Sequence, residues 1–443
     1  MKLLQILFLI LAVLIQLQVV NASETSETAQ INTVIYAGEA LLVPGQLPKK
    51  AVIITIADGR ILKTQSNQPK PVPSGLDTNN VPAFIDLSCC FVMPGFIDVQ
   101  THLQSGPGSP PWHVRMTELT DADFTLKVMI NARNTLQAGF TSIRDMGHSG
   151  RSVFSVHDAI EKGRIEGPRM QVAGEVIRPT GGELRSWLRP EIEPLYQVSA
   201  VCDGPYDCKR AVRAQAAQGA TTIKVVTKQD LGPHSTSQFD LMELIAIREA
   251  GHDLGLKVTA SAFSTPSINL PLKAGFDGVV HGTYVDDETL KLFHNKDAIY
   301  IPTLLAARVV REMAENAALS VSDAWRKENM AIYHGMVGSF RRALKAGVKI
   351  AFGTDAGWRP HGGNAEQMVQ MVELGMSPGE VLNSATLTAA AAMGWDDKVG
   401  SLIAGKFADI VATRISPLDD INTVMSPVFV MKNGKTIRQE IPQ

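Results

Sequence analysis

Net charge, sequence repetition and cysteine are all scarce in this chain of 443 residues. The formal net charge is only −2, which gives no indication of binding to nucleic acid or another polyanion. No low-complexity tract or short-period repeat is present. The 4 cysteines have no histidine near them in the sequence, so a structural zinc cluster is not expected. With 45% hydrophobic and 19% charged residues, the composition is typical of a globular protein that buries a sizeable core.

The first 22 residues predict a secretory signal peptide. Met1-Lys2 gives a basic start, an apolar run follows, and Val20-Asn21-Ala22 provide small residues at the cleavage positions. The run is also long enough to approach a membrane crossing, so an uncleaved anchor is the alternative. Cleavage is favoured, which predicts export to the periplasm or the extracellular space and no membrane attachment afterwards.

Export permits disulfides, so the positions of the cysteines are informative. A Gly-Pro turn separates Cys202 from Cys208, and we expect these two residues to be bridged; two free thiols in a surface loop are the alternative. The adjacent Cys89 and Cys90 are expected on opposite faces of a strand, with one of them in the core.

The two ends of the chain are expected to be rich in β-strand. Short apolar runs broken by Pro and Gly fill residues 31–92, and similar runs return in residues 396–443. The economical interpretation is a small β-sandwich built from both termini. Between them, over residues 93–395, apolar runs alternate with amphipathic helical stretches that often end on glycine. Eight such units in roughly 250 residues predict an α/β fold of the (β/α)8 TIM-barrel type. The strand candidates are GFIDVQTH, TSIRDM, MQVAGEVI, TTIKVVTK, KVTASAF, DGVVHG, IYIPTL and KIAFGTD.

Function in a TIM barrel lies at the C-terminal ends of the strands. Polar residues stand there in place of apolar ones: His102, Lys224, His281 and Asp355. A lysine inside an apolar strand must meet a carboxylate, a metal or a chemical modification. Two imidazoles, a carboxylate and a lysine at one barrel mouth suit zinc or a similar divalent cation, with water as a further ligand. The alternatives for single residues are a hydrogen-bonded histidine, an aspartate that caps the next segment, and a salt bridge between Lys224 and Asp355.

Several longer segments have a characteristic order and spacing: VMPGFIDVQTH, TSIRDMG, TTIKVV, AGFDGVVHGT, IPTLLA, AFGTDAG, His361-Gly362-Gly363-Asn364 and SLIAGKFADIVA. In these segments, which span nearly all of the chain after the predicted signal peptide, the sequence resembles the amidohydrolase superfamily. The resemblance is to the branch of imidazolonepropionase-like proteins and Xaa-Pro dipeptidases. It implies a (β/α)8 barrel with a small β-sandwich made from both termini, and a hydrolase that acts on carbon–nitrogen bonds.

The resemblance also implies which residues hold the metal. The first strand of the family supplies two histidines where this chain has Gln100 and His102, and the fifth supplies a histidine where it has Ser261. The fourth-strand lysine, commonly carbamylated and shared by two metals, is matched by Lys224. Each of the two sites has thus lost one imidazole, and an amide oxygen is a poor zinc ligand beside imidazole. We therefore expect one divalent cation rather than two, zinc or a similar ion, held by His102, carbamylated Lys224, His281 and Asp355.

The mechanism that the resemblance implies is hydrolysis of an amide, cyclic amide or Xaa-Pro-type bond of a small molecule by a metal-activated water. Asp355 would orient the water and act as general base and then acid, and His281 would help to polarise the carbonyl. Glu183 replaces the histidine of a family TGGH segment and is a candidate substrate contact. A solvated loop position is favoured over substrate contact for His361. Cationic groups that suit a substrate carboxylate are Arg185, Arg189 and Lys228.

Two other functions stay open. Gln100 and Ser261 favour a catalytically degenerate relative that serves as a binding or structural protein, whereas the retained Asp355, Lys224 and His281 favour an active hydrolase. A metal-free hydrolase with Ser261 as nucleophile needs a base such as His281, but Ser261 lacks G-x-S-x-G surroundings. The sequence leaves the substrate, the identity of the metal and the number of subunits open, a homo-oligomer included.

Overall fold

A computed structural model describes residues 31–71, 82–107, 112–182, 200–227 and 235–441. The predicted signal peptide lies outside the described residues, so it stays a prediction. The same holds for four candidate substrate contacts: Glu183, Arg185, Arg189 and Lys228.

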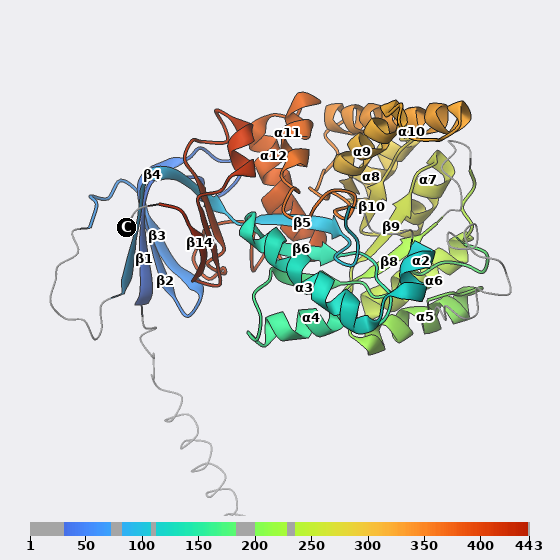
Figure 1. Cartoon of the computed structure of the whole chain (residues 1–443), viewed down its shortest axis with the longest axis horizontal. Coiled ribbons are helices and arrows are strands. Elements are labelled where there is room, and N and C mark those ends of the chain that lie inside the picture. The colour runs from blue at the N-terminus through green and yellow to red at the C-terminus, as the bar shows by residue number, and fades with distance from the viewer. Residues whose placement is uncertain (1–30, 72–81, 108–111, 183–199, 228–234, 442–443) are drawn as a thin grey trace, which may run out of the picture.

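Strands from both ends of the chain form one sheet at one side of the molecule (Figure 1). The sheet is seven-stranded within the described residues, in the order β14-β13-β12-β4-β1-β2-β3. β1 and β4 pair in parallel, and the other neighbours are antiparallel. The strands are β1 (Ile31–Ala40), β2 (Lys49–Ala57), β3 (Arg60–Gln65), β4 (Ala83–Pro94), β12 (Ile410–Thr413), β13 (Phe429–Lys432) and β14 (Lys435–Gln439). The structure thus describes a single mixed sheet here, and the predicted sandwich and the domain boundaries at residues 92 and 396 stay predictions.

The pairing of β1 with β4 contains a bulge. Ala37 pairs with Leu87 and Glu39 with Phe91, so one residue of β1, Gly38, faces three residues of β4. A Cβ atom at Gly38 would overlap the carbonyl oxygen of Ser88, so the bulge needs glycine at that position.

The middle of the chain has a mixed α/β fold with parallel sheets. One sheet has the order β5-β6-β7 and the other β11-β10-β9-β8. Single parallel bridges connect them: Ile177 to Val225, Tyr300 to Ile350, and Thr101 to Ala356. These bridges do not make a continuous ladder, so the closed barrel is not established by the strand pairing. The strands are β5 (Phe96–Thr101), β6 (Phe140–Asp145), β7 (Arg169–Val172), β8 (Ile223–Val226), β9 (Val258–Ala262), β10 (Gly278–His281) and β11 (Ile299–Ile301).

Seven of the eight predicted central strands are confirmed, but the eighth, KIAFGTD, is not a regular strand. The reason lies in its hydrogen bonds. The backbone N–H of Phe352 donates to the carbonyl of Ser384, and that of Thr354 donates to the Asp98 carboxylate. The segment nevertheless lies between β11 and β5, because Val99 donates to the Phe352 carbonyl and Ala351 to the Tyr300 carbonyl.

Helices follow most of the central strands and cover them (Figure 1). Side chains start several helices: Thr120 with Asp123, and Asp240 with Glu243, form reciprocal capping boxes at α3 and α6. The helices are α2 (Trp112–Glu118), α3 (Asp121–Gln137), α4 (Ser152–Glu161), α5 (Pro205–Gln218), α6 (Leu241–Asp253), α7 (Thr265–Ala274), α8 (Asp287–Lys296), α9 (Leu304–Glu315), α10 (Asp323–Lys345), α11 (Glu366–Glu373), α12 (Pro378–Asn383) and α13 (Ala389–Met393), with short π and 3-10 turns η3 (Ser384–Thr388) and η4 (Ile421–Met425).

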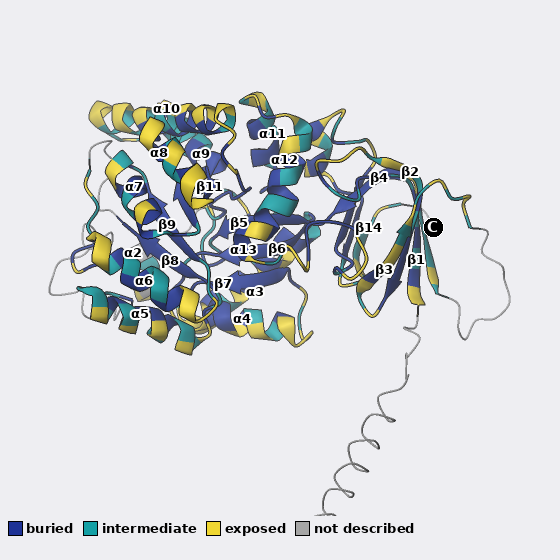
Figure 2. Ribbon diagram, turned by 180° about the vertical axis from the view of Figure 1, so that it is seen from behind, coloured by how far each residue is buried: buried dark blue, intermediate teal, exposed yellow. Residues whose placement is uncertain are grey.

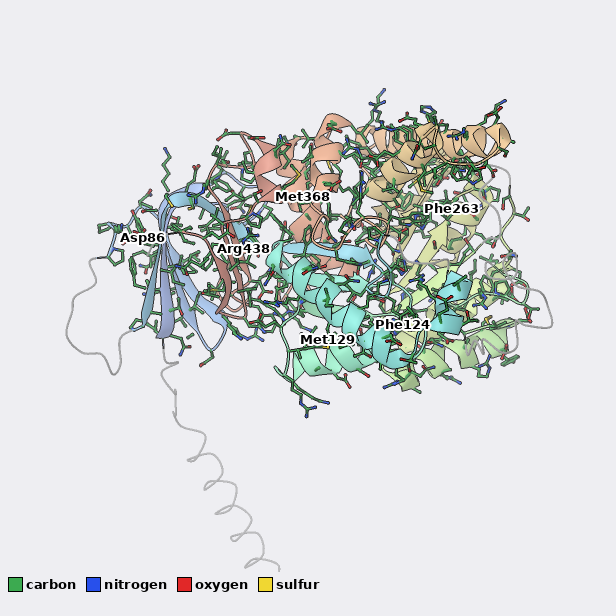
Figure 3. All side chains as sticks on the ribbon, in the orientation of Figure 1. Asp86, Phe124, Met129, Phe263, Met368 and Arg438 are labelled. Carbon is green, nitrogen blue, oxygen red and sulfur yellow. A yellow bond between two sulfur atoms is a disulfide. The ribbon has the colours of Figure 1, made fainter. Side chains whose placement is uncertain are left out.

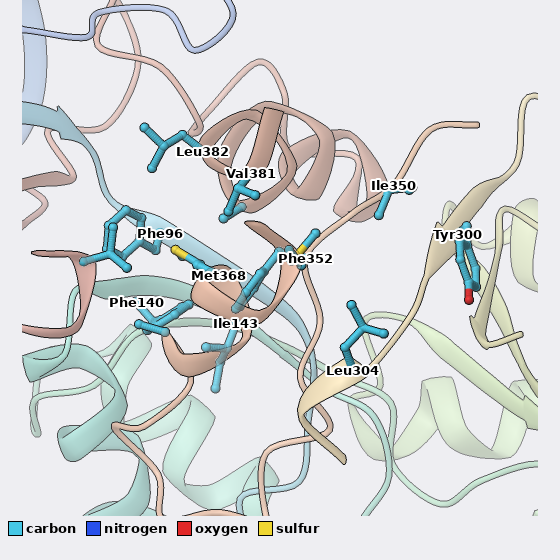
Figure 4. Packing of buried hydrophobic residues seen from close by; sticks show 14 of the residues in the cluster. Phe96, Phe140, Ile143, Tyr300, Leu304, Ile350, Phe352, Met368, Val381 and Leu382 are labelled. Carbon is cyan, nitrogen blue, oxygen red and sulfur yellow. The ribbon is translucent and has the colours of Figure 1, made fainter. Parts of the chain in front are cut away.

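The central strands are buried on both sides, while the outer faces of α4, α5, α8 and α10 are exposed (Figure 2). Aromatic side chains fill the core between β5, β6 and the eighth segment (Figure 4). The ring of Phe140 stacks on Phe352 with centroids 5.7 Å apart and contacts Phe96 at 5.6 Å. Among the described residues, no helix has the length and apolarity to span a membrane.

The structure joins Cys202 to Cys208 by a disulfide whose Cα atoms are 4.9 Å apart. Both residues are buried in a cluster with Ala211, Val212 and Leu244, so the bridge ties the segment before α5 to the start of that helix, next to α6. Cys89 and Cys90 remain free thiols.

Candidate active site

The predicted site residues come from the C-terminal ends of the central strands. Gln100 is in β5 and His102 follows it, Lys224 is in β8, His281 ends β10, and Asp355 ends the irregular eighth segment. Lys224 pairs with Thr259 and Val226 with Ser261, so Lys224 and Ser261 point to the same side of the sheet. Gln100, Lys224, Ser261, His281 and Asp355 are all buried.

Gln100, His102 and Asp355 are in direct contact. The Gln100 amide nitrogen Nε2 donates to Oδ1 of Asp355 at 2.9 Å and lies 3.1 Å from Nε2 of His102. Nε2 of His102 is 3.2 Å from the same Asp355 oxygen. The first-strand position where the family has a histidine is therefore occupied by an amide that binds the carboxylate of the eighth segment.

The hydrogen bond of His102 to the backbone fixes the tautomer of its ring. Nδ1 lies 3.0 Å from the carbonyl oxygen of Gly147, and a carbonyl only accepts, so Nδ1 carries a proton. In the neutral ring the lone pair is then on Nε2, the nitrogen that faces Gln100 and Asp355. Nζ of Lys224 is 3.5 Å from that same nitrogen. Backbone carbonyls orient metal-binding histidines in the same way.

His281 is held from two sides. Its Nδ1 is 2.8 Å from the Thr303 hydroxyl. Its ring stacks on Phe263, a residue labelled in Figure 3, with the centroids 4.4 Å apart. Packing and a hydrogen bond together lock the orientation of the imidazole.

Three residues of this site have left-handed backbone conformations. The φ angles are +68° at His281, +46° at Thr303 and +59° at Asp355. Such values are uncommon for residues other than glycine, above all for the β-branched Thr303. Backbone strain of this kind costs about 1–3 kcal/mol per residue and clusters at functional sites.

The charges around Asp355 keep it ionised. Burial by itself would raise the pKa of its carboxyl group. In the imidazolium form of His102, Nε2 donates to Asp355; this hydrogen bond and the positive charges of His102, His281 and Lys224 outweigh burial and hold the pKa of Asp355 well below its usual value. Asp355 thus interacts with several groups at once, and the alternative of a salt bridge between Lys224 and Asp355 stays open.

Trp358 is a site residue that the sequence reasoning missed. Its indole N–H donates to Oδ2 of Asp355 at 3.1 Å, while 49% of the residue is exposed. Tryptophan three residues after the aspartate was the available signal, but nothing in the sequence shows that the chain turns back there. Thr303, in the IPTLLA segment, was missed for the same reason.

Part of the predicted donor set suits a divalent cation. Oε1 of Gln100 is buried with no hydrogen-bond partner among the described residues. An unpaired acceptor there, beside the lone pair of His102 and the Asp355 carboxylate, is a suitable environment for a cation. In the described part of the chain, no group of three or more carboxylate, thiol or imidazole side chains is arranged to hold a metal ion. These side chains alone therefore do not complete a metal site. A cation would therefore need the modified lysine as a ligand.

The prediction that His361 is a solvated loop residue is wrong. His361 is buried, its Nε2 donates to the Ser105 carbonyl at 3.1 Å, and Nδ1 has no hydrogen-bond partner among the described residues. Nearby, Asn364 donates to Asp98, which also accepts from Thr354, so this loop is tied to the strands that carry the site.

Burial, despite the hydrogen bond to Ser105, lowers the pKa of His361 to about 4. Between pH 6.5 and 4 the unfolded chain binds a proton at this histidine and the folded chain does not, so folding stability falls as the pH decreases. The unaltered protein should lose unfolding free energy between pH 7 and pH 4.5, and in His361→Asn this loss should be smaller by up to about 3 kcal/mol. Urea denaturation of the unaltered protein and of His361→Asn at both pH values measures the difference. Asp98, whose burial raises its pKa to about 6, titrates in the same range with the opposite sign, but it is common to both proteins. Equal pH dependence in the two would contradict the assignment.

Comparison with known proteins places these observations in a family context. The model of the amidohydrolase family matches residues 91–437. Ochratoxinase of Aspergillus niger is 29% identical over 434 residues, with 92% of this chain and 86% of the relative covered. Its crystal structure has a TM-score of 0.80, covering 93% of this chain and 96% of that one. A crystal structure of a Xaa-Pro dipeptidase with bound methionine has a TM-score of 0.82 at 29% identity, with 91% of this chain and 99% of that chain covered. Imidazolonepropionase of Symbiobacterium thermophilum is 40% identical over 76 residues, 16% of this chain and 17% of its own length.

Proposed function

This chain belongs to the amidohydrolase family, and from that premise we propose that it hydrolyses an amide, cyclic amide or Xaa-Pro-type bond of a small molecule with the help of one divalent cation. Relatives similar to this chain are hydrolases that act on carbon–nitrogen bonds. The observation that carries the proposal is the left-handed backbone at His281, Thr303 and Asp355. Backbone strain persists where the surrounding structure holds residues in fixed positions, so strain at three residues of one site supports a function there.

The residues that would hold the cation are His102, Asp355, His281 and Lys224, the last as its carbamate. When bound, a divalent cation lowers the pKa of a coordinated water towards neutrality and polarises a substrate carbonyl. Zinc suits the imidazole and oxygen donors best. The exchanged Gln100 and Ser261 support one cation rather than two.

Asp355 has the central role among the protein groups. Its Oδ1 is held by Gln100 and its Oδ2 by Trp358, so the carboxylate has a fixed orientation. We assign to it the positioning of the attacking water, acceptance of the proton from that water, and delivery of the proton to the leaving nitrogen. His281, whose Nδ1 contacts the Thr303 hydroxyl, would use its other nitrogen, Nε2, as a ligand of the cation; it could donate a hydrogen bond to the substrate carbonyl only if that nitrogen is not coordinated.

The architecture and the location are part of the same proposal. Single bridges at Val225, Tyr300 and Thr101 support a barrel closed by the eighth segment, in line with the similarity to the Xaa-Pro dipeptidase structure. Export follows from the apolar start of the chain and is compatible with the Cys202–Cys208 disulfide.

A second candidate is a catalytically degenerate binding protein. It is favoured by the direct contacts among Gln100, His102 and Asp355, which satisfy one another without a cation. The test that separates the two candidates is metal analysis of the purified protein together with a screen of N-acyl amino acids, Xaa-Pro dipeptides and lactams. Bound metal with hydrolysis of one of these classes supports the first. No bound metal and no turnover of any class, with zinc supplied, supports the second.

Trp358 gives a test of how Asp355 is positioned. Trp358→Phe removes the N–H that donates to Oδ2 and keeps an aromatic ring, so we expect kcat to fall about 10- to 100-fold, the value of a hydrogen bond to a charged group. The measurement is kcat and KM on the substrate class found in the screen. A change in KM with an unaltered kcat would show that Trp358 only contacts substrate.

A further inference from the structure

Cys89 and Cys90 lie in the terminal sheet, away from the candidate active site, and the proposed function does not use them. Their sulfur atoms are 2.8 Å apart, although Cys89 is exposed and Cys90 is buried. Adjacent residues of a regular strand point to opposite faces, so their sulfurs cannot meet. The expectation that one of the two thiols lies in the core is confirmed, because Cys90 is buried and Cys89 is exposed, but the contact of the sulfurs shows that the strand does not separate them.

The bulge in β4 explains the contact. Three residues, Ser88 to Cys90, face the single residue Gly38 of β1, and this extra length breaks the alternation of the strand. The Ser88 carbonyl packs where a side chain at residue 38 would have to be, and the Ser88 N–H donates to Asp86. Asp86, labelled in Figure 3, is itself paired with Lys70. The paired thiols are thus a built feature of the sheet and need glycine at position 38.

The two thiols have different surroundings. Burial, followed by the hydrogen bond with Cys89, raises the pKa of Cys90 to about 12. Cys90 belongs to the core of the terminal sheet with Leu87 and Ile54. An oxidant from solvent therefore meets Cys89 first, and Cys90 is in contact to complete the reaction.

We propose that Cys89 and Cys90 form a redox-active vicinal dithiol that small-molecule disulfides oxidise to a disulfide between adjacent residues. The Cys89 thiolate attacks the small disulfide, forms a mixed disulfide and releases one thiol. Cys90 then loses its proton and attacks the Cys89 sulfur, which releases the second thiol. Two protein thiols are oxidised and one small disulfide is reduced to two thiols.

The closed form should be easily reduced. Neighbouring Cα atoms are about 3.8 Å apart, closer than the about 4.4–6.8 Å usual in disulfides. Strained and exposed disulfides are the labile ones. The Cys202–Cys208 pair, with Cα atoms 4.9 Å apart and both residues buried, should stay oxidised under conditions that open the vicinal pair.

Equilibration of the full-length protein with glutathione buffers of increasing oxidised fraction, followed by acid quenching, alkylation and peptide mass spectrometry, tests the proposal. We expect Cys89 and Cys90 to lose reactivity together, as one internal disulfide. Cys90→Ser should instead accumulate a glutathione adduct at Cys89, and Cys89→Ser should leave Cys90 unmodified in the folded protein. Gly38→Ala, which disturbs the bulge, should shift the product from the internal disulfide to that adduct.

The measurement on the unaltered chain is decisive even if Gly38→Ala does not fold. A persistent glutathione adduct at Cys89 with a free Cys90, or two thiols unchanged across all buffers, would overturn the proposal. Phenylarsine oxide provides an independent readout, because a trivalent arsenical is held by two thiols together. The reduced protein should bind it, whereas Cys89→Ser and Cys90→Ser should not.

Discussion

Replacing Asp355 with asparagine will lower kcat for amide hydrolysis by about 10²–10⁴-fold, the usual contribution of a general acid–base group, and will leave the fold intact. Asparagine has the same shape as aspartate and tolerates the left-handed backbone found at residue 355. It cannot carry the proton of the attacking water to the leaving nitrogen. The measurement is kcat on the substrate class found in the screen, with circular dichroism as the check on folding.

Asp355→Ala is the matched comparison. Alanine also removes the carboxylate, but it lacks the short polar side chain that lets Asp and Asn tolerate a φ of +59°, so it should add a loss of about 1 kcal/mol of folding stability to the same loss of kcat. An Asn variant that keeps the wild-type kcat would place the chemistry on other residues.

The Asn variant also tests the hydrogen bonds to the carboxylate. Asp355 accepts from Gln100 at one oxygen and from Trp358 at the other, whereas an amide can accept at only one position. Either the Gln100 amide N–H or the Trp358 indole N–H then faces the new NH2 group and has no acceptor. This lowers the folding stability by about 1–3 kcal/mol. Adding Trp358→Phe to Asp355→Asn removes one of the competing donors and should restore part of that stability without restoring kcat.

The sequence predicted the elements whose signal is periodic. Seven central strands are apolar runs between turns, and side chains at their ends, such as Lys224 and His281, stand out because apolar residues are expected there. The eighth segment failed as a strand because its backbone donates to the Asp98 side chain and to Ser384 in a helical turn instead of to a neighbouring strand. No local pattern records such partners.

Contacts made by chain reversals were also invisible. Trp358 contacts Asp355 only because the loop after the eighth segment turns back. The same loop brings the buried His361 to the carbonyl of Ser105, to which it donates a hydrogen bond. The bulge opposite Gly38 joins two cysteines that strand alternation would separate. A lone glycine in a strand is a signal for such a bulge, but it does not say which residues of the partner strand are displaced.

The role of the exchanged ligands leads to the second large effect. Gln100→His together with Ser261→His should raise the divalent metal content from about one to about two ions per chain, because each site regains an imidazole in place of a weak oxygen donor. Ser261 lies on the same side of the sheet as Lys224, which the two ions would share.

Metal content after dialysis against metal-free buffer, measured by plasma mass spectrometry, gives the stoichiometry for four proteins: unaltered, the double His variant, Gln100→Ala and His281→Asn. Gln100→Ala should keep the single ion, because an amide oxygen contributes little beside imidazole and carboxylate. His281→Asn should lose it, together with all hydrolysis. If Gln100→Ala keeps the ion and His281→Asn loses it, the remaining ligands still bind a cation. If neither variant differs from a metal-free unaltered chain, the site no longer binds metal. If the unaltered chain binds no ion while the double variant binds two, the cavity has kept its shape and lost its cation, and the binding-protein alternative replaces the hydrolase.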